Sequence, residues 1–161
     1  MNTPKKILCL CFGNSDRSSV MAAVLKIYLK NAGYDVVVES AGVLESAKQD
    51  GGASKFAIVA ASVIGLDVSC HKRRHINSLN LDDYDLFVCA TDEIAFKLVE
   101  AGVDRNKMFN AHVKNPWPLQ FQQDYEPTMI AILGAMYKVV ARYFPARRRK
   151  LFDTSFSTER R

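Results

Sequence analysis

The sequence has no apolar run long enough to cross a membrane. The stretch from Phe56 to Leu66 is far shorter than the ~20 residues that a membrane helix needs. The early run ILCLCF is too short for the core of a signal peptide, and no small-residue cleavage site follows it. We therefore expect a cytoplasmic protein that has no membrane partner.

Cysteine is scarce, and none of its spacings is typical of a metal site. Cys9 and Cys11 are two residues apart, as on one face of a strand, whereas zinc sites use Cys-x2-Cys pairs. His71 and His75 have helical i,i+4 spacing but no obvious carboxylate or cysteine partner. We expect no metal, no cofactor and, in the cytoplasm, reduced cysteines.

The sequence also has no internal repeat, low-complexity linker or visible domain boundary. We expect one domain over 1–150 and a flexible tail over 151–161. The net charge of +5 suits an anionic ligand but does not by itself indicate nucleic acid, and we expect no nucleic-acid partner. Much of that charge lies in ARRRK near the C-terminus and in HKRRH at 71–75, which we interpret as solvated surface.

Strand-forming and helix-forming segments alternate along the chain. Apolar runs predict strands over 5–10, 35–40, 84–90 and 107–113. Helices are predicted from the loop after the first strand to Gly33, from Ser54 to Gly65, from Thr91 to Gly102 and from Pro127 to Tyr143. Ser54 and Thr91 are the expected N-caps, and the second helix is marked by Val59, Val63 and Ile64. This alternation predicts an α/β fold: an open, parallel, four-stranded sheet with helices on both faces.

The stretch CLCFGNSDRSSV, beginning at Cys9, lies between the first strand and the first helix. In open parallel sheets, ligands bind beyond the carboxyl ends of the strands, and the N–H groups at a helix start favour an anion. Gly13 permits close backbone approach, Arg17 offers a fork for two phosphate oxygens, and this positive field lowers the pKa of the Cys11 thiol. Taken singly, Cys11 could be a buried strand cysteine and Arg17 an ordinary helix-start cation, but their combined spacing favours a phosphate-binding loop with a thiolate nucleophile.

CFGNSDRS resembles the signature loop of the low-molecular-weight protein tyrosine phosphatases, a family that includes the thioredoxin-linked arsenate reductases. The resemblance extends from about Lys6 to Phe144. ESAGV at 39–43 is similar to the second-strand segment of the family, GLDVSCHKRRHI to a later histidine-containing stretch, and DDYDLFVCATDE to the third strand and its acidic turn.

The resemblance implies a role for each residue that matches the family. Cys11 would be the nucleophile that forms a phosphocysteine, and Arg17 would clamp the phosphoryl oxygens. Ser18 would donate to the Cys11 sulfur and help it leave. The implied substrate-binding residues are Phe12, Gly13, Asn14, Ser15, Asp16, Ser18 and Trp117.

The resemblance also implies that two residues support the loop. Asn14 would hold the loop in a strained conformation through bonds to Ser40 and His71. Such supporting contacts are expected around a preorganised site.

The clearest departure from the family is at the general-acid position. The family carries Asp-Pro followed by an aromatic residue, whereas this chain has Asn115, Pro116 and Trp117. An amide cannot protonate a leaving phenolate, and loss of general acid catalysis typically costs about 10²–10⁴-fold in rate. Trp117 is expected to wall an aryl pocket, although it could instead be a core aromatic.

Asp16 replaces a cysteine that the family often has before the arginine. Its carboxylate could repel phosphate and raise the Cys11 pKa, act as a substitute proton donor, or turn away toward Arg17 or solvent. Asp124 is another possible acid, but it lies nine positions beyond Asn115 and could face solvent.

The residues and the resemblance leave three candidate functions. The leading one is a cysteine-dependent phosphomonoesterase with reduced or altered activity, acting on a phosphorylated protein or a small phosphomonoester as a monomer or weak dimer. The second is a catalytically impaired, phosphate-binding pseudophosphatase. The third, arsenate reduction, requires two more cysteines to relay a disulfide; Cys70 and Cys89 are expected to be buried thiols, and no partner follows Cys89 in the next helix.

Overall fold

Four short strands form one parallel sheet in the computed structural model, which describes residues 3–145. The sheet order is β2-β1-β3-β4, so that β1 lies in the interior beside β3. The predicted tail at 151–161 and the end of the predicted domain lie outside the described residues. The strands are β1 (Lys6–Cys11), β2 (Val37–Gly42), β3 (Leu86–Cys89) and β4 (Met108–Asn110).

Helices connect the strands, as the alternating pattern predicts. Gly33 and Gly65 follow the first two helices at φ 80° and φ 77°, a conformation that glycine adopts without strain. Ser54 caps the second helix by accepting a hydrogen bond from the Ala57 amide at 3.2 Å. The helices are α1 (Ser18–Asn31), α2 (Lys55–Val63), α3 (Asp92–Glu100) and α4 (Glu126–Tyr143).

Two details of the helices differ from expectation. Thr91 stands at the N-cap of α3, but its hydroxyl donates to Glu93 at 3.4 Å and caps no helix amide. Three apolar residues that mark the second helix in the sequence are partly or largely exposed, because this helix packs through Phe56, Ala57 and Ala61 instead. The exposed residues are Val59, Val63 and Ile64.

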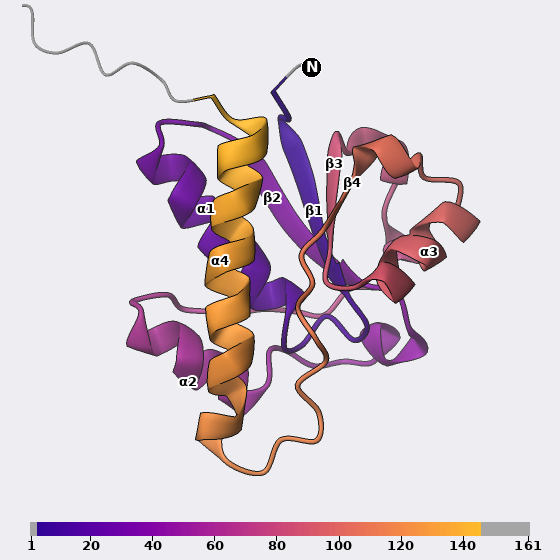
Figure 1. Cartoon of the computed structure of the whole chain (residues 1–161). Coiled ribbons are helices and arrows are strands. Elements are labelled where there is room, and N and C mark those ends of the chain that lie inside the picture. Colours follow the sequence, from indigo (N-terminus) through magenta and orange to yellow (C-terminus); the bar gives the residue numbers. More distant parts are fainter. Residues whose placement is uncertain (1–2, 146–161) are drawn as a thin grey trace, which may run out of the picture.

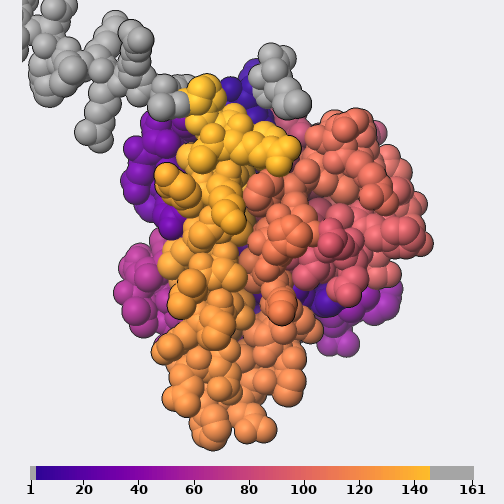
Figure 2. All heavy atoms as spheres, in the orientation of Figure 1, coloured from indigo at the N-terminus to yellow at the C-terminus, as the bar shows by residue number. Residues whose placement is uncertain are grey.

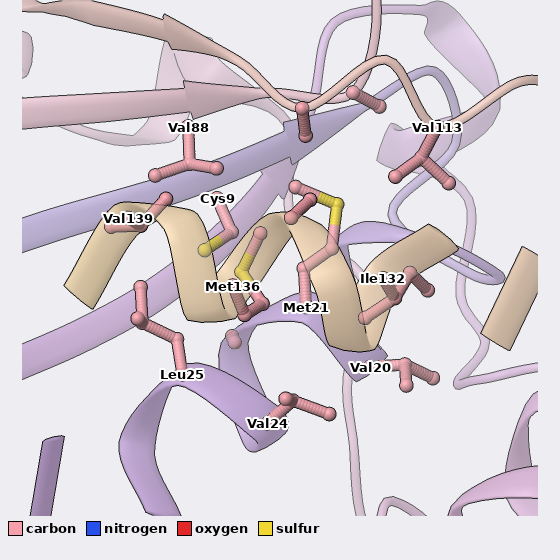
Figure 3. Packing of buried hydrophobic residues seen from close by; sticks show 14 of the residues in the cluster. Cys9, Val20, Met21, Val24, Leu25, Val88, Val113, Ile132, Met136 and Val139 are labelled. Carbon is pink, nitrogen blue, oxygen red and sulfur yellow. The ribbon is translucent and has the colours of Figure 1, made fainter. Parts of the chain in front are cut away.

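Helices cover both faces of the sheet, as Figure 1 shows: α1, α2 and α4 lie on one side and α3 on the other. In Figure 3, Met21 and Leu25 of α1 and Met136 of α4 gather around Cys9 of β1. On the opposite face, Ile94 and Leu98 of α3 pack in a second cluster with apolar side chains of β1 and β3. Two buried layers therefore hold the sheet and fix the direction of its strands.

The carboxyl ends of the strands meet at one end of the sheet, opposite the N-terminal end of β1 (Figure 1). Figure 2 shows α4 running along the front face beside the segment that follows β4. That segment returns under the strand ends and brings residues 111–117 toward the loop after β1. Within residues 3–145, no helix is both long and apolar enough to span a bilayer.

Candidate active site

The loop between β1 and α1 is held in place by Asn14. Its backbone is left-handed, at φ 55°, a region that asparagine tolerates better than most residues. Its Nδ2 donates to Ser40 Oγ at 2.9 Å and to Ser18 Oγ at 2.8 Å, while its Oδ1 accepts from the Arg74 amide at 2.9 Å. His71 Nε2 donates to the Asn14 carbonyl at 2.8 Å. The bonds to Ser40 and His71 are those that the family resemblance implies.

The Cys11 sulfur lies at the start of this loop, 3.0 Å from Ser18 Oγ. Because Ser18 Oγ already accepts a hydrogen bond from Asn14, its own proton is free to point toward the sulfur. The Ser18 hydroxyl is therefore a hydrogen-bond donor placed directly beside the Cys11 sulfur.

Arg17 is the last residue of the loop before α1, and it is almost fully buried. One guanidinium nitrogen donates to the Val113 carbonyl at 3.0 Å, and the guanidinium lies 5.1 Å from the centre of the Phe12 ring. Burial lowers the pKa of Arg17, while the neighbouring Cys11 and Asp16 oppose that shift. A guanidinium group has further N–H donors in a planar fork, and Arg17 lines the same pocket as the Cys11 sulfur.

The sulfur and the guanidinium face a pocket of about 270 Å³. Asn115 and Trp117 come from about a hundred positions further along the chain and form part of its wall. The predicted residues Asn14, Ser18, Ser40 and His71 do not line the pocket but support its loop from behind. The lining residues are Cys11, Phe12, Gly13, Ser15, Asp16, Arg17, Ser46, Arg73, Asn115 and Trp117.

Two lining residues, Ser46 and Arg73, are absent from the sequence-based set. Arg73 donates to the Ser15 hydroxyl at 3.2 Å and to the Gly52 carbonyl at 3.0 Å, which adds a second cation at the pocket. It belongs to the run HKRRH, and the interpretation of that run as solvated surface is wrong for Arg73 and Arg74, which are both partly buried. Their bonds to distant backbone groups could not be read from local composition.

Asp16 turns toward neither Arg17 nor solvent. Its two carboxylate oxygens accept hydrogen bonds from the Ser54 hydroxyl and from the Trp117 indole Nε1, the latter at 2.8 Å. Its carbonyl accepts a hydrogen bond from the Tyr125 hydroxyl. Asp16 therefore ties the nucleophile loop to the start of α2, to the loop carrying Trp117 and to the start of α4.

Asp124 does not reach the pocket. It is exposed, and its carboxylate accepts hydrogen bonds from the Gln120 and Phe121 amides at 3.0 and 2.8 Å. These bonds hold the pKa of Asp124 below its ordinary value, so its carboxyl group stays ionised and is a poor proton donor. Asn115 therefore faces the pocket without Asp124 as a substitute acid.

A glycine outside the loop determines how closely the loop can pack. A Cβ on Gly42 would lie 2.5 Å from the Phe12 carbonyl oxygen and 3.0 Å from the Asn14 nitrogen. At Gly13, where the sequence predicts the close approach, a Cβ would meet only the flexible Ser46 side chain at 3.2 Å. The stringent requirement for glycine therefore falls in the ESAGV segment.

The four cysteines are free thiols in different environments. Burial raises the pKa of the Cys89 thiol to about 12 and that of Cys9 further still. Cys70 is exposed, so the prediction of a buried thiol there is wrong. A relay of disulfides away from Cys11 has no support in this arrangement, because Cys89 is buried and protonated and no second thiol lies near it on α3.

Comparison with known proteins agrees with this geometry. A family model described as low molecular weight phosphotyrosine protein phosphatase matches residues 6–117. No curated protein matches the chain in a sequence search.

Solved structures of similar fold include a tyrosine phosphatase and an arginine phosphatase. A low molecular weight protein tyrosine phosphatase from T. tengcongensis aligns with a TM-score of 0.75 at 22% identity, over 84% of this chain and 97% of its own. Vibrio vulnificus Wzb, solved with benzylphosphonate, aligns with a TM-score of 0.75 at 24% identity, over 85% and 97%. YwlE arginine phosphatase, a mutant with a phosphorylated active-site serine, aligns with a TM-score of 0.75 at 21% identity, over 89% and 98%.

The fold and the loop after β1 thus define a hydrolase of the protein-phosphatase class. The chain belongs to the low molecular weight phosphotyrosine protein phosphatase family, whose members act on phosphorylated substrates.

Proposed function

We propose that the protein is a phosphomonoesterase that uses Cys11 as nucleophile and works without a general acid at position 115. The observation that carries this proposal is the pocket in which the Cys11 sulfur, 3.0 Å from Ser18 Oγ, lies beside the buried guanidinium of Arg17. Thiolate, hydroxyl donor and guanidinium fork are the groups that transfer of a phosphoryl group to sulfur requires.

The reaction has two steps. The Cys11 thiolate attacks phosphorus, the S–P bond forms, and the P–O bond to the leaving alcohol or phenol breaks while Arg17 holds the phosphoryl oxygens. Water then attacks phosphorus, the S–P bond breaks, and the hydroxyl of Ser18 stabilises the departing thiolate. Phosphate is released and Cys11 is regenerated.

Asn115 determines which esters react. Its amide cannot supply a proton to the leaving oxygen, so that oxygen departs as an anion. A phenol as acidic as p-nitrophenol leaves readily in this form, whereas tyrosine, with a pKa of ~10, does not. We infer a preference for esters of acidic leaving groups and slow hydrolysis of phosphotyrosine.

The wall of the pocket supports an aromatic or planar substituent next to the phosphate. Trp117 lines the pocket and packs edge-on against Phe56, with ring centres 6.3 Å apart. Benzylphosphonate, bound in the related Wzb, combines a phosphonate with an aryl ring. Because another relative is an arginine phosphatase, phosphoarginine belongs in the substrate panel beside phosphotyrosine.

A phosphate-binding pseudophosphatase is the second candidate, and Asn115 is the observation that favours it. The cradle formed by the nucleophile loop and Arg17 would then recognise a phosphorylated partner without releasing phosphate. Both functions predict anion binding, so only turnover separates them.

The deciding experiment is a series of aryl phosphates whose phenols differ in pKa, measured for wild type and Asn115→Asp. We expect wild-type kcat/KM to fall steeply with rising phenol pKa. Asn115→Asp should flatten that dependence and raise phosphotyrosine turnover ten-fold or more, within the range of about 10²–10⁴ for general acids. Asn115→Gln is the matched control, because it alters the side chain without adding an acid.

Two results would contradict the proposal. Brisk wild-type turnover of phosphotyrosine that Asn115→Asp leaves unchanged would mean that another group donates the proton. Phosphate binding without hydrolysis of p-nitrophenyl phosphate in either form would identify a binding protein.

The remaining expectations concern the location, the domain extent, the oligomeric state and the partners of the protein. Four free cysteines support a cytoplasmic location, since thiols stay reduced there. The single domain over 1–150, the monomeric or weakly dimeric state and the absence of a nucleic-acid partner stay predictions.

A further inference from the structure

A second and larger cavity lies beside the edge strand of the sheet. It has a volume of about 610 Å³ and shares no lining residue with the Cys11 pocket. We call it the α1–β2 groove, because α1, β2 and the segment 66–74 form its walls. Its volume falls within the range of about 300–1,000 Å³ that is usual for small-molecule sites.

Positive charge gathers along this groove. Lys26 and Lys30 lie on one face of α1, one turn apart, and Lys72 of the segment 66–74 also lines the groove. Among the residues that the structure describes, no acid forms an ion pair with any of these three lysines. Two acids line the groove: Glu39 is held by Lys6 at 3.5 Å and by Arg74 at 3.1 Å, and Asp67 accepts a hydrogen bond from the Ser69 amide at 2.8 Å.

Part of the groove lining, which we call its floor, is apolar and consists of Ile27 of α1, Val38 of β2, Leu66 and Val68. A ligand that fits both features carries an anionic group for the lysines and a flat or apolar body for the floor. A bare inorganic anion would leave the apolar part uncovered.

We propose that the α1–β2 groove binds a small organic phosphate of nucleoside diphosphate size, at a site separate from the Cys11 pocket. The lysines contact the phosphates, and the apolar floor contacts the organic part. Binding there does not depend on hydrolysis at Cys11, so the proposal stands or falls independently of the proposed function.

The groove borders the residues that hold the nucleophile loop. Ser40, His71 and Arg74 line it, and each of them contacts Asn14 through the hydrogen bonds described above. A ligand in the groove would therefore contact residues that support the loop after β1.

Cys70 provides a local reporter, because it is exposed and lines the groove. The test measures the rate at which iodoacetamide, a neutral reagent, labels each cysteine, with peptide mapping, in the presence of ADP. At ADP concentrations about ten times its Kd, roughly one site in ten stays free, so labelling of Cys70 should slow about ten-fold. The double variant Lys26→Ala/Lys72→Ala should lose this protection.

The control variant Lys5→Ala/Lys138→Ala removes the same charge elsewhere and should retain full protection. Pyrophosphate and adenosine, each tested alone, should protect Cys70 far less than ADP. Absence of protection by ADP, or protection that persists in the groove double variant, would overturn the proposal. Equal protection by pyrophosphate and ADP would overturn the assignment of an organic phosphate.

Discussion

The hydrogen bond between Asp16 and Trp117 ties the loop after β1 to the loop that carries Trp117, and its removal should loosen both. The indole Nε1 lies 2.8 Å from a carboxylate oxygen of Asp16. A hydrogen bond to a charged group contributes about 1.5–3 kcal/mol and a neutral one about 0.5–1.5 kcal/mol. Asp16→Asn, which keeps the shape of the side chain, should therefore weaken this bond by about 1 kcal/mol, with a lower value where water reaches the half-exposed Trp117.

A double-mutant cycle isolates the bond from the other contacts of Asp16. Asp16→Asn, Trp117→Phe and their combination should show a coupling free energy of about 1 kcal/mol in thermal unfolding. That coupling corresponds to about 2–4 °C in Tm for a domain of this size. Asp35→Asn, an exposed carboxylate on a distant loop, is the matched control and should not couple to Trp117→Phe.

Trp117 also serves as a probe, since it is the single tryptophan of the chain. Its emission should shift to longer wavelength, and acrylamide should quench it more strongly, in Asp16→Asn than in wild type. A coupling free energy below about 0.5 kcal/mol, together with unchanged emission, would refute the role of Asp16 as a tether.

Three further predictions follow from the same structure. Iodoacetamide should label Cys11, which lines the pocket, and the exposed Cys70 well before Cys9 and Cys89, whose pKa values burial raises. Phosphate should protect Cys11 alone. Peptide mapping measures the labelling, and equal labelling of all four cysteines would refute the prediction. Burial lowers the pKa of His71, and so do the charges of Arg74, Arg73 and Lys26, although the bond of His71 to Asn14 opposes them. The unfolded chain therefore takes up the proton more readily than the folded one. As a result, Tm should fall as pH drops below about 6.5. His71→Gln should flatten that dependence between about pH 5 and 7, whereas the exposed His112→Gln should not. Gly42→Ala should destabilise the fold by about 1–3 kcal/mol and lower activity, because the added Cβ would overlap the loop after β1. Gly134→Ala, where the added Cβ meets open space, should be tolerated. Equal Tm values for the two variants would contradict the packing argument.

The order of strands and helices could be predicted from the sequence because the signals are local. Continuous apolar runs mark strands that are buried on both faces, and Gly33 and Gly65 end helices because they adopt positive φ. The burial of α2 could not be predicted in this way. Val59 and Val63 face outward while Phe56 packs inward, since the packing partner of a helix is set by tertiary contacts and not by its own pattern.

The proximity of Cys11 and Arg17 could be predicted from their spacing in one short segment, whereas the contacts of Asn14 and Ser18 were implied by the resemblance to the family. The partners of Asp16 were not visible. Trp117 is about a hundred positions away, and no local pattern indicates that its indole reaches the loop. Arg73 was hidden for the same reason, since a basic run carries no information about which of its members turns inward.

We propose that Cys11 carries the phosphoryl group during turnover. The most direct measurement is a rapid-quench reaction of wild type with p-nitrophenyl phosphate, followed by peptide mapping of the trapped enzyme. We predict a burst of p-nitrophenolate, a phosphoryl group on the Cys11 peptide, and neither signal in Cys11→Ser. A phosphoryl group on another residue, or turnover that survives in Cys11→Ser, would contradict the account.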